Sequence, residues 1–364
     1  MTKKLKLSTT LDWSLVILPI LLSVASVATL YSITSLSGNH SLVYNQLVYI
    51  GLGALLYTVF VLFDYKVTKQ YATYFFFAGI LLLVLTDLLG QTVFGSRRWI
   101  DLGFTQFQPS ELMKLLFLIF SAAYFSKFEK TTVRRLVFFL FLSIIPIFLI
   151  LAEPDLGTSL VMSAIIISVI LVSRVPKKVL AVLFVAMVMM LPVVWTQLKP
   201  YQKDRLTTFI HPENDRLHSG YNVSQSKIAV GSGGLFGKGF SGATQSQLQF
   251  LPVAHIDFIF SGWAEATGFV GSIGLVLVYC LLVYRIFSIG YLAKDRFGLV
   301  YCIGLGGMIF FQVFVNIGMN IGIMPVTGIP LPLVSAGGTS FLVVSASLGF
   351  VQSIYMRRKS LRFD

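Results

Sequence analysis

The chain has 364 residues, of which 56% are apolar and only 12% are charged, and its formal net charge is +13. Soluble domains carry about 25% charged residues, so this composition excludes an ordinary soluble domain and indicates a polytopic membrane protein. Because the basic residues are distributed among short segments between apolar runs, the positive charge argues against a nucleic-acid partner.

Ten apolar runs follow one another along the chain, and each approaches the length of about 20 residues that crosses a bilayer as a helix. Their approximate bounds are 13–35, 43–63, 71–89, 111–126, 135–152, 156–173, 179–197, 259–284, 297–317 and 335–356. The long segment 198–258 separates the seventh run from the eighth. We therefore predict an all-α polytopic membrane protein, a single integral membrane domain over residues 1–364, with about ten transmembrane helices and a large loop between helices 7 and 8.

The distribution of basic residues predicts the orientation of these helices. Most of the 28 lysine and arginine residues lie at the two chain ends and in alternate short connections. Short cytoplasmic loops are enriched in these residues, whereas long loops escape the rule. We expect both termini to be cytoplasmic and the 198–258 loop to be extracytoplasmic.

Two segments are rich in glycine. Residues 231–242 (GSGGLFGKGFSG) lack the Walker A spacing, and the GxGxxG formed by Gly237, Gly239 and Gly242 has no strand before it. We interpret the run as a loop that needs positive φ or close backbone approach; a phosphate-binding nest of backbone amides stays open. Residues 318–338 hold three prolines and five glycines, which predicts a re-entrant or cavity-lining loop.

Asp257 is the leading catalytic candidate, because it stands where the 198–258 loop returns to the eighth apolar run. An ionisable group at such a boundary is costly to keep unless it has a use. Glu111 and Lys114 open the fourth run at i, i+3 spacing, so they either pair with each other or face a substrate. Asp155 is either a site residue or the N-cap of the sixth helix.

These charges suit glycosyl transfer from a lipid-linked sugar pyrophosphate. The reaction needs a carboxylate that takes a proton from the attacking hydroxyl and positive charge where the pyrophosphate leaves. We expect Asp257 to be the base; the alternative is that Asp257 holds a divalent cation, Mg²⁺ or Mn²⁺, that neutralises the pyrophosphate. The candidate substrate-binding residues are Arg97, Arg98, Glu111, Lys114, Asp155, Arg205, Lys227 and Lys238. The scattered histidines lack metal-ligand spacing.

Five segments resemble the SEDS family (shape, elongation, division, sporulation), and within it the RodA branch. They are GSRRWIDLGFTQFQPSELMKL, EPDLGTSL, YQKDRLTTFIHPENDRLHSGYNVSQSKIAVGSGGLFGKGF, TQSQLQFLPVAHIDFIF and MPVTGIPLPLVSAGGTS. The sequence departs from the family's usual acidic residues at two positions, Val253 and Ala266. These departures put in doubt an acidic cluster around Asp257.

The resemblance implies a peptidoglycan glycosyltransferase of the bacterial cytoplasmic membrane. Such a protein polymerises lipid II into glycan strands, linked to undecaprenyl pyrophosphate, during cell elongation and cell-shape maintenance. A class B penicillin-binding protein is its expected partner. Asp257 would be the essential carboxylate, and Glu111, Lys114 and Asp155 would line the same extracytoplasmic cavity.

Two other functions stay open: a transporter that flips lipid II and a non-enzymatic scaffold that recruits a synthase. Broken helices and buried charges also occur in transporters, where they lie near the middle of the membrane. Here the acidic residues lie near the predicted outer face of the membrane, which favours an enzyme over a transporter.

Overall fold

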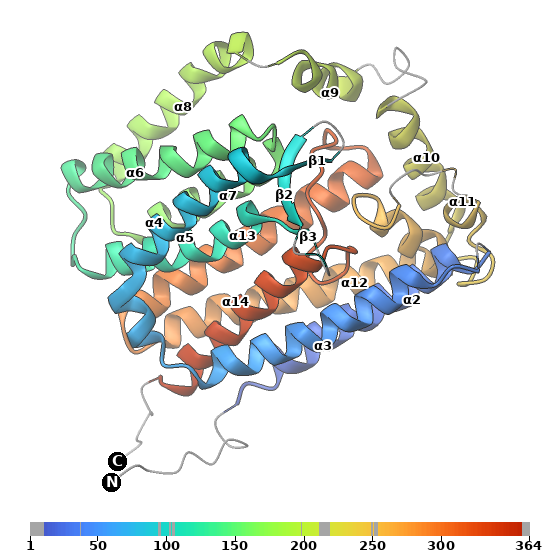
Figure 1. The fold of residues 1–364 in the computed structure, drawn as a ribbon, viewed down its shortest axis with the longest axis horizontal. Coiled ribbons are helices and arrows are strands. Elements are labelled where there is room, and N and C mark those ends of the chain that lie inside the picture. The colour runs from blue at the N-terminus through green and yellow to red at the C-terminus, as the bar shows by residue number, and fades with distance from the viewer. Residues whose placement is uncertain are drawn as a thin grey trace.

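The computed structural model describes residues 11–36, 38–93, 96–101, 103, 106–197, 199–210, 219–248, 250 and 254–358. The described residues contain ten long helices; nine of them pack against one another as a bundle, and the other, α8, extends away from it (Figure 1). The ten helices are α2 (Ser14–Thr34), α3 (Ser41–Leu62), α4 (Tyr65–Leu89), α5 (Pro109–Ser126), α6 (Val133–Ala152), α7 (Leu156–Val172), α8 (Lys177–Gln197), α12 (Ile259–Leu292), α13 (Arg296–Ile321) and α14 (Gly338–Met356). Each predicted apolar run overlaps one of them, and several helices extend beyond the predicted bounds, as α4 and α12 do.

Seven of these helices are long and apolar enough to cross a membrane, as judged over the described residues. They are α2, α3, α4, α6, α12, α13 and α14, and α7 is a shorter apolar helix. The predicted class, a polytopic helical membrane protein, is confirmed, although the length and composition of seven helices rather than ten meet this criterion.

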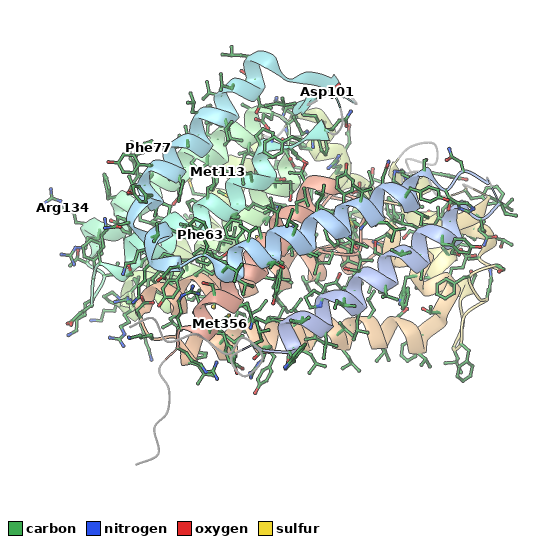
Figure 2. All side chains as sticks on the ribbon, turned by 60° about the horizontal axis from the view of Figure 1, so that its bottom comes forward. Phe63, Phe77, Asp101, Met113, Arg134 and Met356 are labelled. Atoms are coloured by element: carbon green, nitrogen blue, oxygen red, sulfur yellow. The ribbon has the colours of Figure 1, made fainter. Side chains whose placement is uncertain are left out.

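The core lies around α13, which packs against α12, α7 and α5, while α14 packs against α3. Met113 on α5 is fully buried there, whereas Phe77 on α4 is 54% exposed and points away from the bundle (Figure 2). A helix that is apolar on its buried and its outer faces is typical of a membrane span. The outer apolar side chains therefore identify the surface that faces lipid.

A small antiparallel sheet lies beyond the end of α4 and before α5. Its strands, in the order β1-β2-β3, are β1 (Gln91–Val93), β2 (Ser96–Asp101) and β3 (Gln106–Phe107). Strand β2 contacts both α4 and α5. The sheet therefore holds Arg98, on β2, near the first turn of α5.

The described part of the 198–258 loop is largely helical. It contains α9 (Pro200–Ile210), α10 (Ser219–Ser232) and α11 (Thr244–Gln247). Helix α10 packs against α12 and α13. Residues 322–337, between α13 and α14, are non-helical, and their side chains Ile329, Leu331 and Val334 are buried in the core. This non-helical backbone is buried in protein, as such backbone must be within a membrane unless it lines a cavity. The expectation of a re-entrant or cavity-lining loop stays a prediction.

The glycine-rich run interrupts α12 by docking against it. Gly268 inside α12 has φ 69° and ψ −162°, which breaks the helical hydrogen-bond ladder. The amides of Lys238 and Gly239 donate to the carbonyls of Glu265 and Ala266 at 3.0 and 2.9 Å, and so satisfy carbonyls that the break leaves free. A segment inserted into the ladder is one of the established causes of a helix kink.

Gly237 allows this contact. Its φ is +80°, and a Cβ there would lie 2.2 Å from the carbonyl oxygen of Ala266. Only glycine tolerates both conditions without strain. The interpretation of 231–242 as a loop with positive φ and close backbone approach is confirmed.

Candidate functional site

Asp257 lies two residues before α12, on a segment that α13 holds in place. The side-chain amides of Asn316 and Asn320, one turn apart on α13, donate to the carbonyl oxygen of Asp257 at 3.0 and 3.1 Å. The Ser335 hydroxyl donates to the neighbouring Ile256 carbonyl at 2.6 Å. Within the described residues, no hydrogen bond or ion pair engages the Asp257 carboxylate. The backbone is fixed and the carboxylate stays available.

Asp155 begins α7 and ties it to two other elements. Its carboxylate accepts hydrogen bonds from the Thr158 amide at 3.0 Å and the Thr158 hydroxyl at 2.9 Å, so the N-cap interpretation is confirmed. It also accepts a hydrogen bond from Nε2 of Gln108 at 3.1 Å and lies 3.7 Å from Nη1 of Arg98. This buried carboxylate therefore orients Arg98.

The segment 327–329 brings Arg205 and the start of α7 to Asp257. Arg205 on α9 donates to the carbonyl of Thr327 at 3.3 Å. A Cβ on Gly157 would lie 2.8 Å from that same oxygen, and a Cβ on Gly328 would lie 3.7 Å from Oδ2 of Asp257. These close approaches place α9, the start of α7 and the segment that carries Asp257 around residues 327–329.

We call Asp257, Asp155, Arg98 and Arg205 the Asp257 cluster. Burial raises the pKa of Asp257 to about 6; Arg205 and Arg98 oppose this shift, and Asp155 adds to it. A general base works best when its pKa is near the operating pH, because it is then ionised and still basic. The cluster combines such a carboxylate with two guanidinium groups that suit a phosphate.

Glu153 is a further candidate site residue, which the sequence analysis did not single out. It lies at the end of α6 and is 3% exposed, and both carboxylate oxygens are buried without a hydrogen-bond partner in the described part of the chain. Burial and the neighbouring Asp155 raise its pKa to about 8, against the opposing effect of Arg98. The side chain is therefore neutral at pH 7. In the sequence, the only indication of Glu153 is that it is an acidic residue two positions before Asp155.

Glu111 and Lys114 form a buried ion pair with an Nζ–Oε1 distance of 2.7 Å. Lys114 is 1% exposed and Glu111 is 3% exposed. In the described residues the Lys114 ammonium contacts Glu111 and none of the charges of the Asp257 cluster. The predicted pairing is confirmed, and contact with a substrate stays a prediction that requires the surrounding side chains to move.

Two predicted cations contact groups outside the Asp257 cluster. Lys238 is 3.4 Å from Glu265, whose buried carboxylate also accepts the amides of Gln245 and Ser246 and so anchors α11. Lys227 is exposed on α10 and lies over Gly322 at the end of α13. Substrate binding by either lysine stays a prediction.

Two further predicted features fall outside what the structure describes. Arg97 belongs to β2, where it pairs with Thr92, but its side chain lies outside the described part of the chain, as does Val253. The side chain of Ala266 is buried.

The described side chains alone do not form a metal site. The described residues contain no group of three or more His, Cys, Asp or Glu side chains placed to hold a metal ion. Mg²⁺ is commonly bound by one or two carboxylates together with substrate phosphates and water. A cation at Asp257 therefore stays a prediction in which phosphate oxygens complete the coordination.

The chain is similar to curated proteins of known name. The peptidoglycan glycosyltransferase MrdB of Escherichia coli is 39% identical over 86% of this chain and 85% of its own length. A probable peptidoglycan glycosyltransferase FtsW of Nitrosomonas europaea is 36% identical over 79% of this chain and 75% of its own length.

Two solved structures share the fold. One comes from work on the structural coordination of polymerization and crosslinking by a peptidoglycan synthase complex. It matches with a TM-score of 0.83 and 33% identity, and the match covers 96% of this chain and 98% of the solved chain. The rod shape determining protein RodA of Thermus thermophilus has a TM-score of 0.73 and 30% identity, and covers 96% of this chain and 98% of that chain. A family model for cell cycle proteins of the FtsW/RodA/SpoVE type matches residues 7–360. The chain therefore belongs to the FtsW/RodA/SpoVE family, the SEDS family that the sequence motifs resemble.

Proposed function

We propose that this protein is a peptidoglycan glycosyltransferase that polymerises lipid II into glycan strands during cell elongation. It acts as a multi-pass protein of the bacterial cytoplasmic membrane, with both termini cytoplasmic and Asp257 on the extracytoplasmic side. Residues 1–364 form one integral membrane domain, in which 198–258 is the extracytoplasmic loop. The names of the relatives support the reaction, and the excess of basic residues at the opposite end supports the orientation.

One observation carries the chemistry: the Asp257 carboxylate has no hydrogen-bond partner among the described residues, yet its backbone is fixed and two arginines lie in electrostatic range. The carboxylate takes the proton of the acceptor sugar hydroxyl as that oxygen attacks the donor's anomeric carbon. Arg205 and Arg98 stabilise the charge on the departing pyrophosphate. Since a pyrophosphate leaves without protonation, the reaction needs no second carboxylic acid.

The decisive experiment uses the purified protein in detergent with labelled lipid II. Asp257→Asn keeps the size of the side chain but removes its charge, so we expect polymerisation to fall at least about 100-fold. Asp204→Asn is the matched control, because Asp204 is an exposed carboxylate on α9, next to Arg205. Near wild-type polymer from the Asp257→Asn protein would exclude the role of Asp257. Polymer made without any bilayer also excludes both a flippase and a scaffold as the whole function.

We further propose a class B penicillin-binding protein as the partner that crosslinks the strands, with its single transmembrane helix packed on α12 and α13. Leu277 on α12 and Phe310 on α13 are 56% and 59% exposed, which leaves apolar surface for such a helix. The native Cys280 is also exposed on α12 and provides a crosslinking position. A cysteine replacing Phe141 on α6, across the bundle in Figure 1, is the control. Capture of the partner from position 141 alone would refute the placement.

A further inference from the structure

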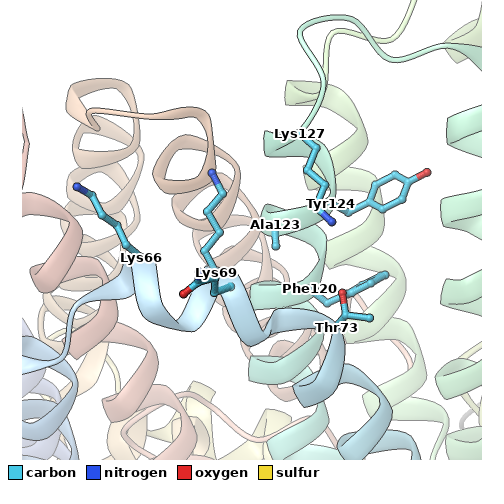
Figure 3. A pocket seen from close by; sticks show the side chains of 8 residues that line it. Lys66, Lys69, Thr73, Phe120, Ala123, Tyr124 and Lys127 are labelled. Atoms are coloured by element: carbon cyan, nitrogen blue, oxygen red, sulfur yellow. The ribbon is translucent and has the colours of Figure 1, made fainter.

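A pocket of about 510 Å³ opens between the first turns of α4 and the last turns of α5 (Figure 3). Its lining residues are Lys66, Lys69, Gln70, Thr73, Phe120, Ala123, Tyr124 and Lys127. Helix α5 begins beside Gln108, which contacts Asp155 of the Asp257 cluster, and ends at this pocket. The pocket therefore lies at the opposite end of the bundle from Asp257.

Three lysines give the pocket an uncompensated positive charge. Within the described residues, no carboxylate lies within 4.0 Å of the ammonium groups of Lys66, Lys69 and Lys127, and no acidic side chain lines the pocket. The neighbouring Asp64 caps α4 and lies 3.7 Å from Arg357 instead. Figure 3 shows Lys66 and Lys69 extending from α4 and Lys127 extending from the end of α5. Three cations that line one pocket without a paired carboxylate favour the binding of an anion there.

The rest of the pocket lining is mixed, with Gln70 and Thr73 on α4 and Phe120, Ala123 and Tyr124 on α5. Phe120 and Ala123 are buried beneath the lysines. Along α4, Tyr74 and Phe77 are 73% and 54% exposed, on the part of the helix that continues from the pocket toward the middle of the bundle. An anion bound here could therefore extend apolar chains along α4. Basic pockets between transmembrane helices suit the phosphate groups of anionic lipids.

We propose that this pocket binds the phosphate headgroup of an anionic phospholipid, with Lys66, Lys69 and Lys127 around the phosphate and the acyl chains against α4. The volume lies within the range of small-ligand sites, about 300 to 1,000 Å³. The inference does not depend on the reaction at Asp257, and its test in detergent does not depend on the orientation in the membrane.

The test measures how much lipid the purified full-length protein retains. Short-chain phosphatidylglycerol is titrated in detergent, with short-chain phosphatidylcholine and inorganic phosphate as separate arms, and bound lipid is counted by native mass spectrometry. The test variant is Lys66→Gln/Lys69→Gln/Lys127→Gln. The control is Lys130→Gln/Lys177→Gln/Lys178→Gln, which removes the same charge from exposed lysines that do not line the pocket.

We expect wild type and control to bind phosphatidylglycerol alike and the test variant to bind it about 100-fold more weakly, since three lysine contacts are lost. Single substitutions should give intermediate losses, which a folding defect would not produce in graded form. Equal retention by the test and control variants would overturn the proposal. So would equal binding of phosphatidylcholine, or displacement of the lipid by inorganic phosphate at matched concentration, because the site would then not recognise an anionic lipid.

Discussion

The buried Glu111–Lys114 pair allows a test that separates folding from catalysis. Lys114→Met would strand the Glu111 carboxylate, which is 3% exposed and whose Oε2 already has no hydrogen-bond partner in the described part of the chain. Removing one partner of a buried ion pair costs about 3 to 5 kcal/mol of the free energy of unfolding. The exchanged protein, Glu111→Lys/Lys114→Glu, keeps both charges and should recover most of that loss.

The exchanged protein should not recover all of the lost stability, because the dipole of α5 disfavours the exchanged charges. Glu111 lies in the first turn of α5, where the positive end of the helix dipole favours an anion. The exchange removes a favourable anion from this turn and puts an unfavourable cation there, and each of these two changes costs about 0.3 to 1 kcal/mol. We therefore expect the exchanged protein to be about 1 to 2 kcal/mol less stable than wild type, and clearly more stable than Lys114→Met.

Polymerisation should not recover with stability. If Lys114 stabilises the leaving pyrophosphate, the exchange moves that cation by about one helical turn, and loss of one preorganised group costs about 100-fold or more in rate. Thermal unfolding and lipid II polymerisation, measured on one preparation of the exchanged protein, provide both readings. Recovery of stability and activity together would refute a catalytic role for Lys114 and leave a purely structural pair.

Three further predictions follow from the site and the kink. Because the pKa of Asp257 is raised to about 6, the ionised base is lost as pH falls, so polymerisation should fall about tenfold per pH unit below 6 in a pH–rate profile. The pKa of Glu153 is about 8 in the folded protein, against an ordinary value of 4.5, so the folded state keeps a proton that the unfolded state loses. The free energy of unfolding should therefore decline as pH rises from about 4.5 to about 8. Thermal melts should show this decline in wild type and not in Glu153→Gln. Gly237→Ala should destabilise the protein by more than about 1 kcal/mol, since its Cβ would lie 2.2 Å from the oxygen of Ala266, whereas Gly274→Ala, with open space around it, should be neutral or stabilising in the same melts.

The sequence alone determined the features that depend on neighbouring residues. Apolar runs of spanning length must satisfy their backbone hydrogen bonds internally, so each predicts a helix, and each of the ten predicted ranges overlaps one. Asp155 as an N-cap and Gly237 at positive φ were likewise readable, because caps and left-handed turns are local properties of the chain. The position of Asp257 just before α12 follows from where the apolar run begins.

Only the tertiary structure decided which charges meet. Lys238 lies against Glu265 rather than in the Asp257 cluster, and Arg98 joins that cluster because β2 brings it to Asp155. The burial of Glu153 without a hydrogen-bond partner in the described residues is also a tertiary property, because no local sequence pattern indicates whether a helix end is buried. Side chains on different helices are paired by packing among distant segments, and hydrophobic periodicity carries no information about which segments those are.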